Sequence, residues 1–253
     1  MTAFRDRIAL VTGAGQGIGK ATARILASGG ADLALNDINP KTLRETKAEL
    51  EKIGAHVTSH EGSVTDENFV TDMIDDVTRK HGRIDLLLNN AGGGPANIPW
   101  QGFSECDFSH FREIFELNFF SQAMVLHKVL PGMIERGYGK VVCISSISAV
   151  LGQEYGCAYA SGKLALHALV SSVSKEAARF GVNINAAILG NPPHHTRTDE
   201  RQNYLDQLSH LNRVGDLEEF GSALAFLLSD DASYITGAAI PIDGGLTNPR
   251  MNE

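Results

Sequence analysis

Short apolar runs alternate with amphipathic stretches along the whole chain. Seven apolar runs indicate strands, at Ile8–Val11, Asp32–Leu35, His56–His60, Ile84–Leu88, Lys140–Ile144, Asn183–Ile188 and Ala238–Ile242. Helical periodicity covers Gly17–Ser28, Pro40–Ile53, Asp66–His81, Asp107–Glu135, Ala158–Phe180 and Leu217–Leu228. This alternation predicts an α/β fold, a doubly wound parallel sheet of about seven strands with helices on both faces. No repeat or linker divides the chain, so we predict a single domain over residues 1–253.

The stretch from Gly190 to about Gly215 is the longest one without a regular pattern. Pro192 and Pro193 stiffen its beginning, because each fixes φ and lacks an N–H. A connection this long in a compact domain is usually functional. We therefore predict a substrate lid at about residues 190–215.

Composition and charge exclude several classes of partner. The formal charge of −8 comes without a basic patch, which argues against nucleic acid, and no apolar run is long enough to cross a membrane. A strand beginning at Ile8 leaves no room for a signal peptide. The three cysteines lack the spacing of metal ligands and indicate reduced thiols, so we expect a cytoplasmic protein with no metal site.

A glycine-rich segment, Thr12-Gly13-Ala14-Gly15-Gln16-Gly17-Ile18-Gly19, joins the first strand to the first helix. Glycines permit a tight turn and let the backbone approach a pyrophosphate. The helix that follows offers free N–H groups and a partial positive charge to the phosphates. A glycine-rich turn alone is a weak signal, but its place between strand and helix favours a dinucleotide site. The residues expected to bind the cofactor here are Gly13, Gln16, Gly17, Ile18 and Gly19.

Asp37 follows the second strand, about twenty residues after the glycine-rich segment. A carboxylate at this place bonds the ribose 2′-hydroxyl of NAD and repels the 2′-phosphate of NADP. No lysine or arginine lies in the segment or directly beside Asp37 to offset that repulsion. The alternative is a capping or solvated aspartate. The sequence favours NAD as the cofactor.

Tyr159 and Lys163 have the i, i+4 spacing that puts a phenol and an ammonium on one face of a helix. A neighbouring cation favours the phenolate, which makes the phenol a better acid–base catalyst. Ser146 ends a strand thirteen residues earlier, where the carboxyl ends of a parallel sheet face the ligand crevice. Tyr155 has Tyr159 rather than a lysine at its +4 position, so it is a better candidate for a pocket wall.

These motifs resemble those of the short-chain dehydrogenase/reductase family over essentially the full length of the chain. Residues 12–19 match the family's cofactor segment, and Ser146, Tyr159 and Lys163 match its catalytic triad. The resemblance implies a Rossmann-like fold and assigns further roles. Asn118 falls on the asparagine that helps to hold a proton-relay water, although alone it could equally be a core amide. Asn90, Ala91 and Gly92 follow the fourth strand and are implied in cofactor binding, as are Tyr159 and Lys163.

The chain departs from the family pattern at two places. Where the family often has an aspartate near the adenine, this chain has Ser63 followed by Val64, and serine still offers hydrogen bonds. Where the family commonly has Pro-Gly and then a threonine near the carboxamide, this chain keeps Gly190. Its next threonine, Thr196, lies farther along than usual. Ser63, Val64, Gly190 and Thr196 therefore complete the expected cofactor site.

The predicted activity is hydride transfer between NAD(H) and an alcohol or ketone. A biosynthetic ketone reductase such as a 3-oxoacyl reductase is the alternative, and Asp37 argues weakly against it because such enzymes mostly use NADPH. A cofactor-bound sensor without turnover stays open, although the intact catalytic set argues against it. The expected substrate-pocket residues are Gly94, Gln153, Tyr155, His194 and His195. The resemblance also implies a homo-oligomer, a dimer or tetramer formed through the long helices.

Overall fold

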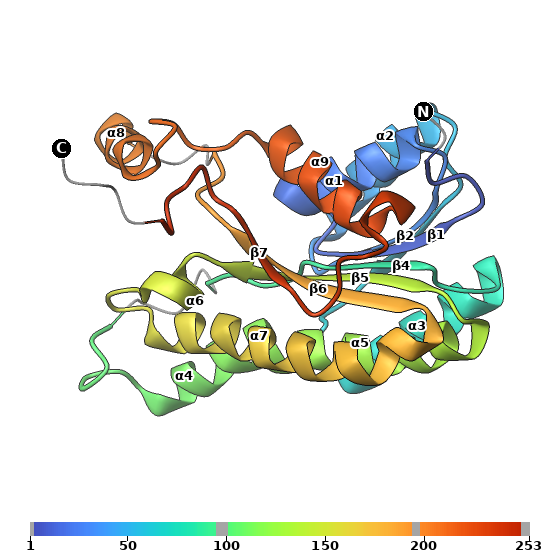
Figure 1. The fold of residues 1–253 in the computed structure, drawn as a ribbon, viewed down its shortest axis with the longest axis horizontal. Helices are drawn as coiled ribbons and strands as arrows, with labels where there is room; N and C mark the ends of the chain where they lie inside the picture. Colours follow the sequence, from blue (N-terminus) through green and yellow to red (C-terminus); the bar gives the residue numbers. More distant parts are fainter. Residues whose placement is uncertain (1–2, 95–100, 194–197, 249–253) are drawn as a thin grey trace.

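Seven parallel strands form one sheet, in the order β3-β2-β1-β4-β5-β6-β7, in a computed structural model that describes residues 3–94, 101–193 and 198–248 (Figure 1). The strands are β1 Ile8–Thr12, β2 Asp32–Asp37, β3 Val57–Glu61, β4 Leu86–Asn89, β5 Gly139–Ser146, β6 Val182–Leu189 and β7 Ala239–Ile242. The strand order reverses between β1 and β4, which is where a doubly wound sheet opens a ligand crevice. The predicted fold class is confirmed.

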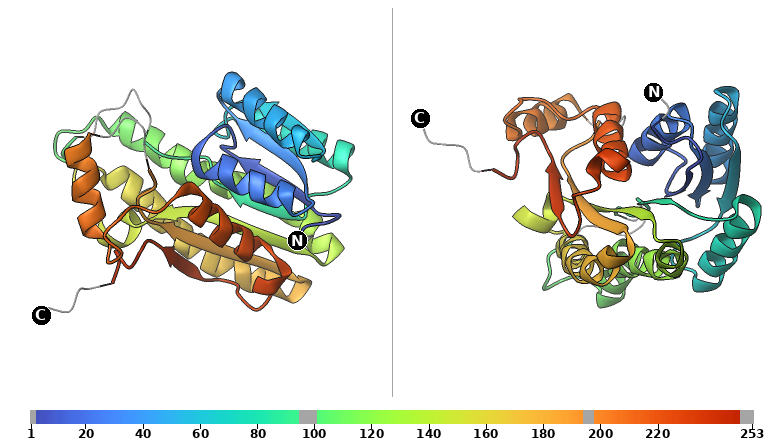
Figure 2. Two further views of the ribbon diagram at one scale, coloured as in Figure 1. Left: turned by 90° about the horizontal axis from the view of Figure 1, so that it is seen from above. Right: turned by 45° about the vertical axis from the view of Figure 1, so that its right-hand side comes forward.

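Helices cover both faces of this sheet (Figure 1). The helices are α1 Gly17–Ser28, α2 Pro40–Lys52, α3 Glu67–His81, α4 Phe108–Phe115, α5 Ser121–Arg136, α6 Ser148–Leu151, α7 Cys157–Ala177, α8 Asp199–Leu208 and α9 Leu217–Leu228. Apolar residues of α1, α2 and α9 pack against one face, and those of α3, α5 and α7 pack against the other. α8 stands beyond the sheet, at the end where α6 lies (Figure 2).

The local sequence explains why the central elements form. Every residue of β1, β4 and β5 is buried, as expected for parallel strands covered on both faces. α2 begins with Asn39 as its N-cap and Pro40 in its first turn, and α3 begins with Asp66 as its N-cap and ends at the left-handed Gly82. Within the described residues, no helix has the length and apolar character that a membrane crossing requires.

Two expectations about helices were wrong. The helix predicted over 107–135 is interrupted by a π-helical turn, Glu116–Phe120, between α4 and α5. The Asn118 side chain donates to the carbonyl oxygen of Ile114, one turn earlier, which disturbs the regular hydrogen-bond ladder. The stretch 190–215 contains α8, capped by Thr198 and anchored by the buried Leu205. That a single domain spans 1–253, with a lid at 190–215, stays a prediction.

Candidate active site

The glycine-rich segment folds into a tight cradle after β1, which we call the glycine cradle (residues 12–19 with Asn90). Gly13 has φ +63°, and a Cβ there would lie 2.8 Å from Nδ2 of Asn90. A Cβ on Gly19 would collide with the carbonyl oxygen of Gly13. Only glycine permits these approaches, so the packing of α1 against the turn explains the sequence pattern.

Hydrogen bonds lock this cradle to the turn that follows β4. Thr12 Oγ1 accepts from the backbone N–H groups of Asn90 (2.9 Å) and Ala91 (3.0 Å). Asn90 Nδ2 donates to the carbonyl oxygens of Thr12 (3.0 Å) and Gly13 (3.1 Å). The Asn90 side chain therefore holds the backbone of the cradle in place. Gly92 lies next to Lys163, because a Cβ there would be 2.9 Å from its Nζ.

The N-terminus of α1 fits the phosphates of a dinucleotide. Its N-cap residue, Gln16, makes no side-chain hydrogen bond to the helix, and its first turn holds no acidic residue. The first N–H groups therefore keep their capacity to bind an anion, at the positive end of the helix. Gly17, at φ +57°, and Ile18 begin this helix beside the cradle.

Asp37 lies at the carboxyl end of β2, against the cradle. Its Oδ2 accepts from the N–H of Gly15 at 2.8 Å, and its Oδ1 accepts from the N–H of Asn39 at 2.9 Å. These bonds fix the orientation of the carboxylate beside the glycine cradle. Ser63 Oγ accepts from the N–H of Thr65 at 3.2 Å, and Val64 is buried, so both help to shape the turn after β3.

The proposed catalytic hydroxyls of Ser146 and Tyr159 come together at the carboxyl end of β5. Ser146 is the last residue of the strand, 9% exposed, and its Oγ accepts from the N–H of Ser148 at 3.2 Å. Tyr159, in the first turn of α7, is hydrogen-bonded to the Ser146 side chain. Burial raises the pKa of Tyr159, and the bond to Ser146 opposes that rise. A hydroxyl pair at this place can hold and protonate a single substrate oxygen.

Lys163 lies one turn after Tyr159 and is only 2% exposed. Its Nζ donates to the carbonyl oxygen of Ile144 at 2.8 Å and lies 5.8 Å from the centre of the Tyr159 ring. Burial lowers the pKa of Lys163 to about 7. Burying an ammonium away from water costs free energy, so Lys163 is a candidate functional residue.

Asn118 reaches the same crevice from the π-helical turn. Its Oδ1 accepts from the N–H of Gly93 at 2.8 Å, and its Nδ2 donates to the oxygens of Gly93 (2.8 Å) and Ile114 (2.9 Å). The side chain is fully buried and holds the segment after β4 against α4. The Asn118 side chain has backbone hydrogen-bond partners, as a core amide would. This is compatible with the role in holding a proton-relay water that the family resemblance implies.

A small pocket of about 30 Å³ lies beside Tyr159. Tyr155 lines it, is 58% exposed and has φ +60°, while His110 and Cys106 reach it from the segment at α4. Nδ1 of His110 is buried without a hydrogen-bond partner among the described residues. The sequence analysis did not single out His110, because a lone histidine near a helix start carries no motif.

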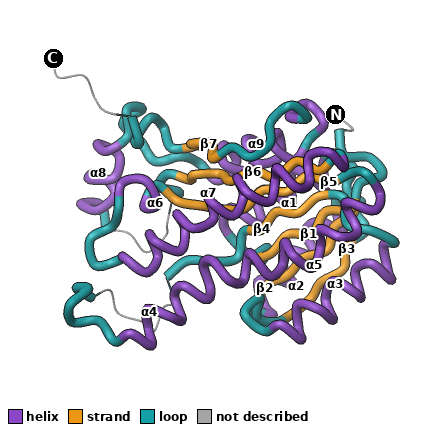
Figure 3. The backbone as a smooth tube through the Cα atoms, turned by 60° about the horizontal axis from the view of Figure 1, so that its bottom comes forward, coloured by secondary structure: helices purple, strands orange, loops and turns teal. Residues whose placement is uncertain are grey.

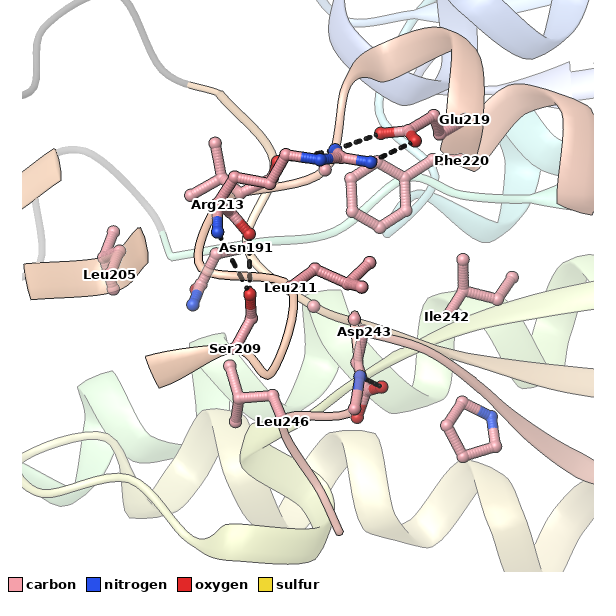
Figure 4. Close-up of a pocket in the computed structure, with 16 residues that line it drawn as sticks. Asn191, Leu205, Ser209, Leu211, Arg213, Glu219, Phe220, Ile242, Asp243 and Leu246 are labelled. Atoms are coloured by element: carbon pink, nitrogen blue, oxygen red, sulfur yellow. Dashed lines mark hydrogen bonds and ion pairs between the residues drawn. The ribbon is translucent and has the colours of Figure 1, made fainter. Parts of the chain in front are cut away.

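A larger pocket of about 340 Å³, the lid pocket, opens where β6 and β7 end (Figure 4). Its described lining includes Asn191, Leu205, Ser209, Arg213, Glu219 and Asp243. Arg213 donates two hydrogen bonds to Glu219, at 2.7 and 2.6 Å, above the ring of Phe220 (Figure 4). Ser146 and Tyr159 do not line it, but Ser146 is paired in register with Leu189, the residue before Gly190.

Of the remaining predicted site residues, the structure describes some and not others. Gly190 packs against Asp243, since a Cβ there would lie 2.7 Å from its Cα, and its N–H donates to Ile242. Gln153 accepts from the hydroxyl of Ser148 at 2.7 Å, and Gly94 is exposed after β4. His194, His195 and Thr196 lie outside the described residues. The roles of these residues stay predictions.

Comparisons with known proteins agree with this geometry. A family model described as "Enoyl-(Acyl carrier protein) reductase" matches residues 13–247. The chain is 33% identical to the levodione reductase of Leifsonia aquatica, over 96% of this chain and 95% of the relative. The chain belongs to the short-chain dehydrogenase/reductase family. As a member of this family it is an oxidoreductase, and the resemblance found in the sequence is confirmed.

Two further members extend the comparison. The 3-oxoacyl-[acyl-carrier-protein] reductase of Thermotoga maritima is 32% identical, over 96% of this chain and 98% of the relative. A solved structure of 7 alpha-hydroxysteroid dehydrogenase complexed with NADH and 7-oxo glycochenodeoxycholic acid has a TM-score of 0.90 at 28% identity. It covers 96% of this chain and 95% of that one. The family thus spans reductases and dehydrogenases that share this fold.

Proposed function

We propose that this oxidoreductase transfers a hydride between NAD(H) and the carbon of a secondary alcohol or ketone. The observation that carries the proposal is the hydrogen-bonded pair of Ser146 and Tyr159 above the buried Lys163. A hydroxyl pair backed by a buried amine suits proton transfer to and from one oxygen atom. A solved relative with NADH bound supports the class of cofactor.

NAD, when bound, supplies the hydride acceptor for the oxidation. In that direction Ser146 donates a hydrogen bond that orients the substrate oxygen, and Tyr159 as phenolate takes the hydroxyl proton as the carbonyl forms. The Lys163 ammonium favours the phenolate, because an opposite charge close to the ring stabilises it. Asn118 holds the segment at Gly93 in place beside Lys163. In the reductive direction Tyr159 returns the proton to the new hydroxyl.

We propose NAD rather than NADP as the preferred cofactor. The Asp37 carboxylate accepts from the N–H of Gly15 in the cradle and from the N–H of Asn39, so its charge cannot move away from a 2′-phosphate without losing these bonds. The family itself includes both specificities, since one relative from Sphingomonas is a rhamnose dehydrogenase that uses NAD(P)+. The argument therefore depends on the Asp37 carboxylate and not on the family.

A 3-oxoacyl reductase is the second candidate, favoured by the relative from Thermotoga maritima. It differs in its preferred direction and in a long acyl substrate. The sensor without turnover is disfavoured, because Ser146 and Tyr159 are hydrogen-bonded and Lys163 is anchored to Ile144 nearby, which supports a proton-transfer role. For the oxidoreductase, we propose that a lid formed by residues 190–215 selects the substrate. The residues proposed to line the substrate pocket are Gly94, Gln153, Tyr155, His194 and His195.

The experiment that tests this proposal is an activity panel. Purified protein is supplied with NAD or NADP and with secondary alcohols, sugars, hydroxysteroids and hydroxy acids, and reduced cofactor is measured. A parallel set supplies NADH or NADPH with cyclic ketones and 3-oxoacyl thioesters. We expect turnover with NAD and one alcohol class. Turnover confined to NADPH and 3-oxoacyl thioesters would favour the second candidate, and none in either set would favour the sensor.

The homo-oligomer and the cytoplasmic location remain proposals. Phe108, Phe120 and Leu164, on α4, the π-helical turn and α7, are each about half exposed. Large apolar side chains in that arrangement suit a contact with a second copy of the chain. Figure 3 shows α4 and α5 running beside α7. The mass of the protein in solution, by light scattering, tests whether it is a dimer or tetramer.

A further inference from the structure

Two histidines and an aspartate lie together near the amino-terminal ends of β2 and β3. This is the end of the sheet opposite the catalytic crevice. Asp32 begins β2, His56 precedes β3, and His81 ends α3. One donor atom from each residue lies within 4.8 Å of the others. No described residue of the catalytic set belongs to this group. Asp32 lies roughly 16 Å from Asp37, because β2 advances about 3.3 Å per residue.

Strand pairing explains why His56 and Asp32 meet. β2 and β3 run parallel with Leu33 paired to Val57, and the N–H of Leu33 donates to the oxygen of His56 at 2.9 Å. The preceding residues, Asp32 and His56, therefore share one face of the sheet. Nδ1 of His56 lies 3.7 Å from Oδ2 of Asp32. The backbone thus holds two of the three donors together before any ligand arrives.

The third donor is held from the helix side. α3 lies beside β3 at this edge of the sheet (Figure 3). Nε2 of His81 is 2.9 Å from Oγ1 of Thr58, which fixes the ring. The rings of His56 and His81 are 4.9 Å apart at their centres. The nearby Lys80 pairs with Asp76 at 2.7 Å, and Arg79 contacts the same carboxylate.

We propose that Asp32, His56 and His81 form a binding site for Zn²⁺, separate from the catalytic site. Two imidazoles and a carboxylate are a donor set that zinc prefers, with water as a fourth ligand. Donors around a tetrahedral zinc lie roughly 3.3 Å apart, given metal–nitrogen bonds of about 2.0 Å. The 3.7 Å between His56 and Asp32 is close to that value, and one donor atom from each of the three residues lies within 4.8 Å of the others.

Exposure makes the site accessible to a metal ion. The side chain of His56 is 64% exposed and that of Asp32 is 44% exposed, so an ion can enter from solvent. Thr58 is the polar partner behind His81 that orients a ligating ring. The spacing of these residues carries no motif, because about 25 residues separate each from the next. The sequence analysis accordingly expected no metal site.

The test is a zinc titration of tag-free protein followed by calorimetry. We expect one Zn²⁺ per chain in the wild-type protein, and an affinity at least about tenfold weaker in His56→Ala and in Asp32→Asn. His127→Ala is the matched control, since His127 is an exposed imidazole on α5, and it should leave the affinity unchanged. Zinc should also raise the Tm of the wild-type protein more than that of His56→Ala, because the ion binds only the folded chain.

A second readout fixes the ligand set. Co²⁺ should give the intense visible absorption of a tetrahedral site in the wild-type protein and lose it in His81→Ala. His56→Ala keeps the test valid if His81→Ala does not fold, because His56 is exposed. Binding of equal strength in the wild type, His56→Ala and Asp32→Asn would overturn the site, and so would the absence of saturable zinc uptake. Turnover with NAD should be the same in His56→Ala and in the wild type.

Discussion

The glycine cradle and the lid pocket both lie at the carboxyl ends of the strands, but they are made of different groups. The cradle consists of backbone N–H and carbonyl groups, held by Thr12 and Asn90 at 2.9–3.1 Å. The lid pocket is lined by side chains from three separate segments, among them Arg213 and Asp243. A site made of backbone tolerates little change, whereas a site made of side chains can be altered one group at a time.

The largest effect on cofactor affinity is expected where a side chain would enter the glycine cradle. Gly19→Ala places a Cβ against the carbonyl oxygen of Gly13, and neither backbone segment can give way easily. We expect the affinity for NADH, measured by fluorescence titration, to fall by at least about a hundredfold. Gly102→Ala is the control, because nothing lies within 4 Å of a Cβ there. Equal affinity in the two variants would show that the cradle is not the cofactor site.

A smaller effect is expected from the charge that we assign to cofactor choice. Asp37→Asn keeps an acceptor for the N–H of Gly15 and removes the negative charge. We expect the ratio of kcat/KM for NAD to that for NADP to fall by at least about tenfold, ~1.4 kcal/mol. Asp32→Asn removes the same charge at the other end of β2 and should leave the ratio unchanged. An unaltered ratio in Asp37→Asn would remove the basis for preferring NAD.

For the buried Lys163, we expect the fold to be less stable with the lysine than without it, although turnover needs the lysine. Burial lowers the pKa of Lys163 to about 7 from 10.5, so the unfolded chain binds more protons between these values and stability rises with pH there. Lys163→Met removes a penalty on the order of a few kcal/mol at pH 7. The carbonyl oxygen of Ile144, which loses Lys163 as a donor in this variant, still accepts from the side-chain amide of Gln122 at 3.1 Å.

We therefore expect Lys163→Met to lose turnover but to melt several degrees higher than the wild type at pH 7 without cofactor. The difference in Tm should shrink as the pH rises toward 10.5. Lys175→Met, on the exposed side of α7, should change neither property. A variant that melts below the wild type at pH 7 would contradict the assigned penalty.

The smallest effect is expected in the lid pocket. Arg213→Gln breaks an ion pair with Glu219 in which both side chains are about half exposed, so little stability depends on it. If the pocket selects substrate, KM for the best alcohol should rise by roughly threefold to tenfold, ~1 kcal/mol, while NADH affinity stays the same. Arg24→Gln is the control, because it breaks a similarly exposed ion pair, with Glu218, outside the 190–215 stretch. A loss of NADH affinity in Arg213→Gln would mean that the two regions are not separate.

The same contrast explains what could be predicted from the sequence. Strands such as β1 and β5 are buried throughout, so their apolar runs identify them. Gly13 and Gly19 are required by backbone geometry, and such residues leave a pattern in the sequence. Tyr159 and Lys163 lie one helical turn apart, so their relation is also local.

What escaped prediction depends on contacts between distant residues. In the π-helical turn the side chain of Asn118 donates to the carbonyl oxygen of Ile114, a contact that periodicity does not detect. The helix α8 has a capping Thr198 and acidic residues in its first turn, but only Leu205 as an apolar anchor. His110 reaches the pocket at Tyr159 only through the fold of α4 against α7.

The most direct test of the proposed chemistry is the rate of NAD reduction by Tyr159→Phe and Tyr155→Phe, with the best alcohol of the panel. Tyr159 is hydrogen-bonded to Ser146, whereas Tyr155 lies 58% exposed on the pocket wall. We predict that Tyr159→Phe keeps its Tm and its NADH affinity while kcat/KM falls by at least about a thousandfold, as expected for a lost general acid–base group. Tyr155→Phe should retain activity within severalfold of the wild type. Turnover near the wild-type rate in Tyr159→Phe would contradict the assignment.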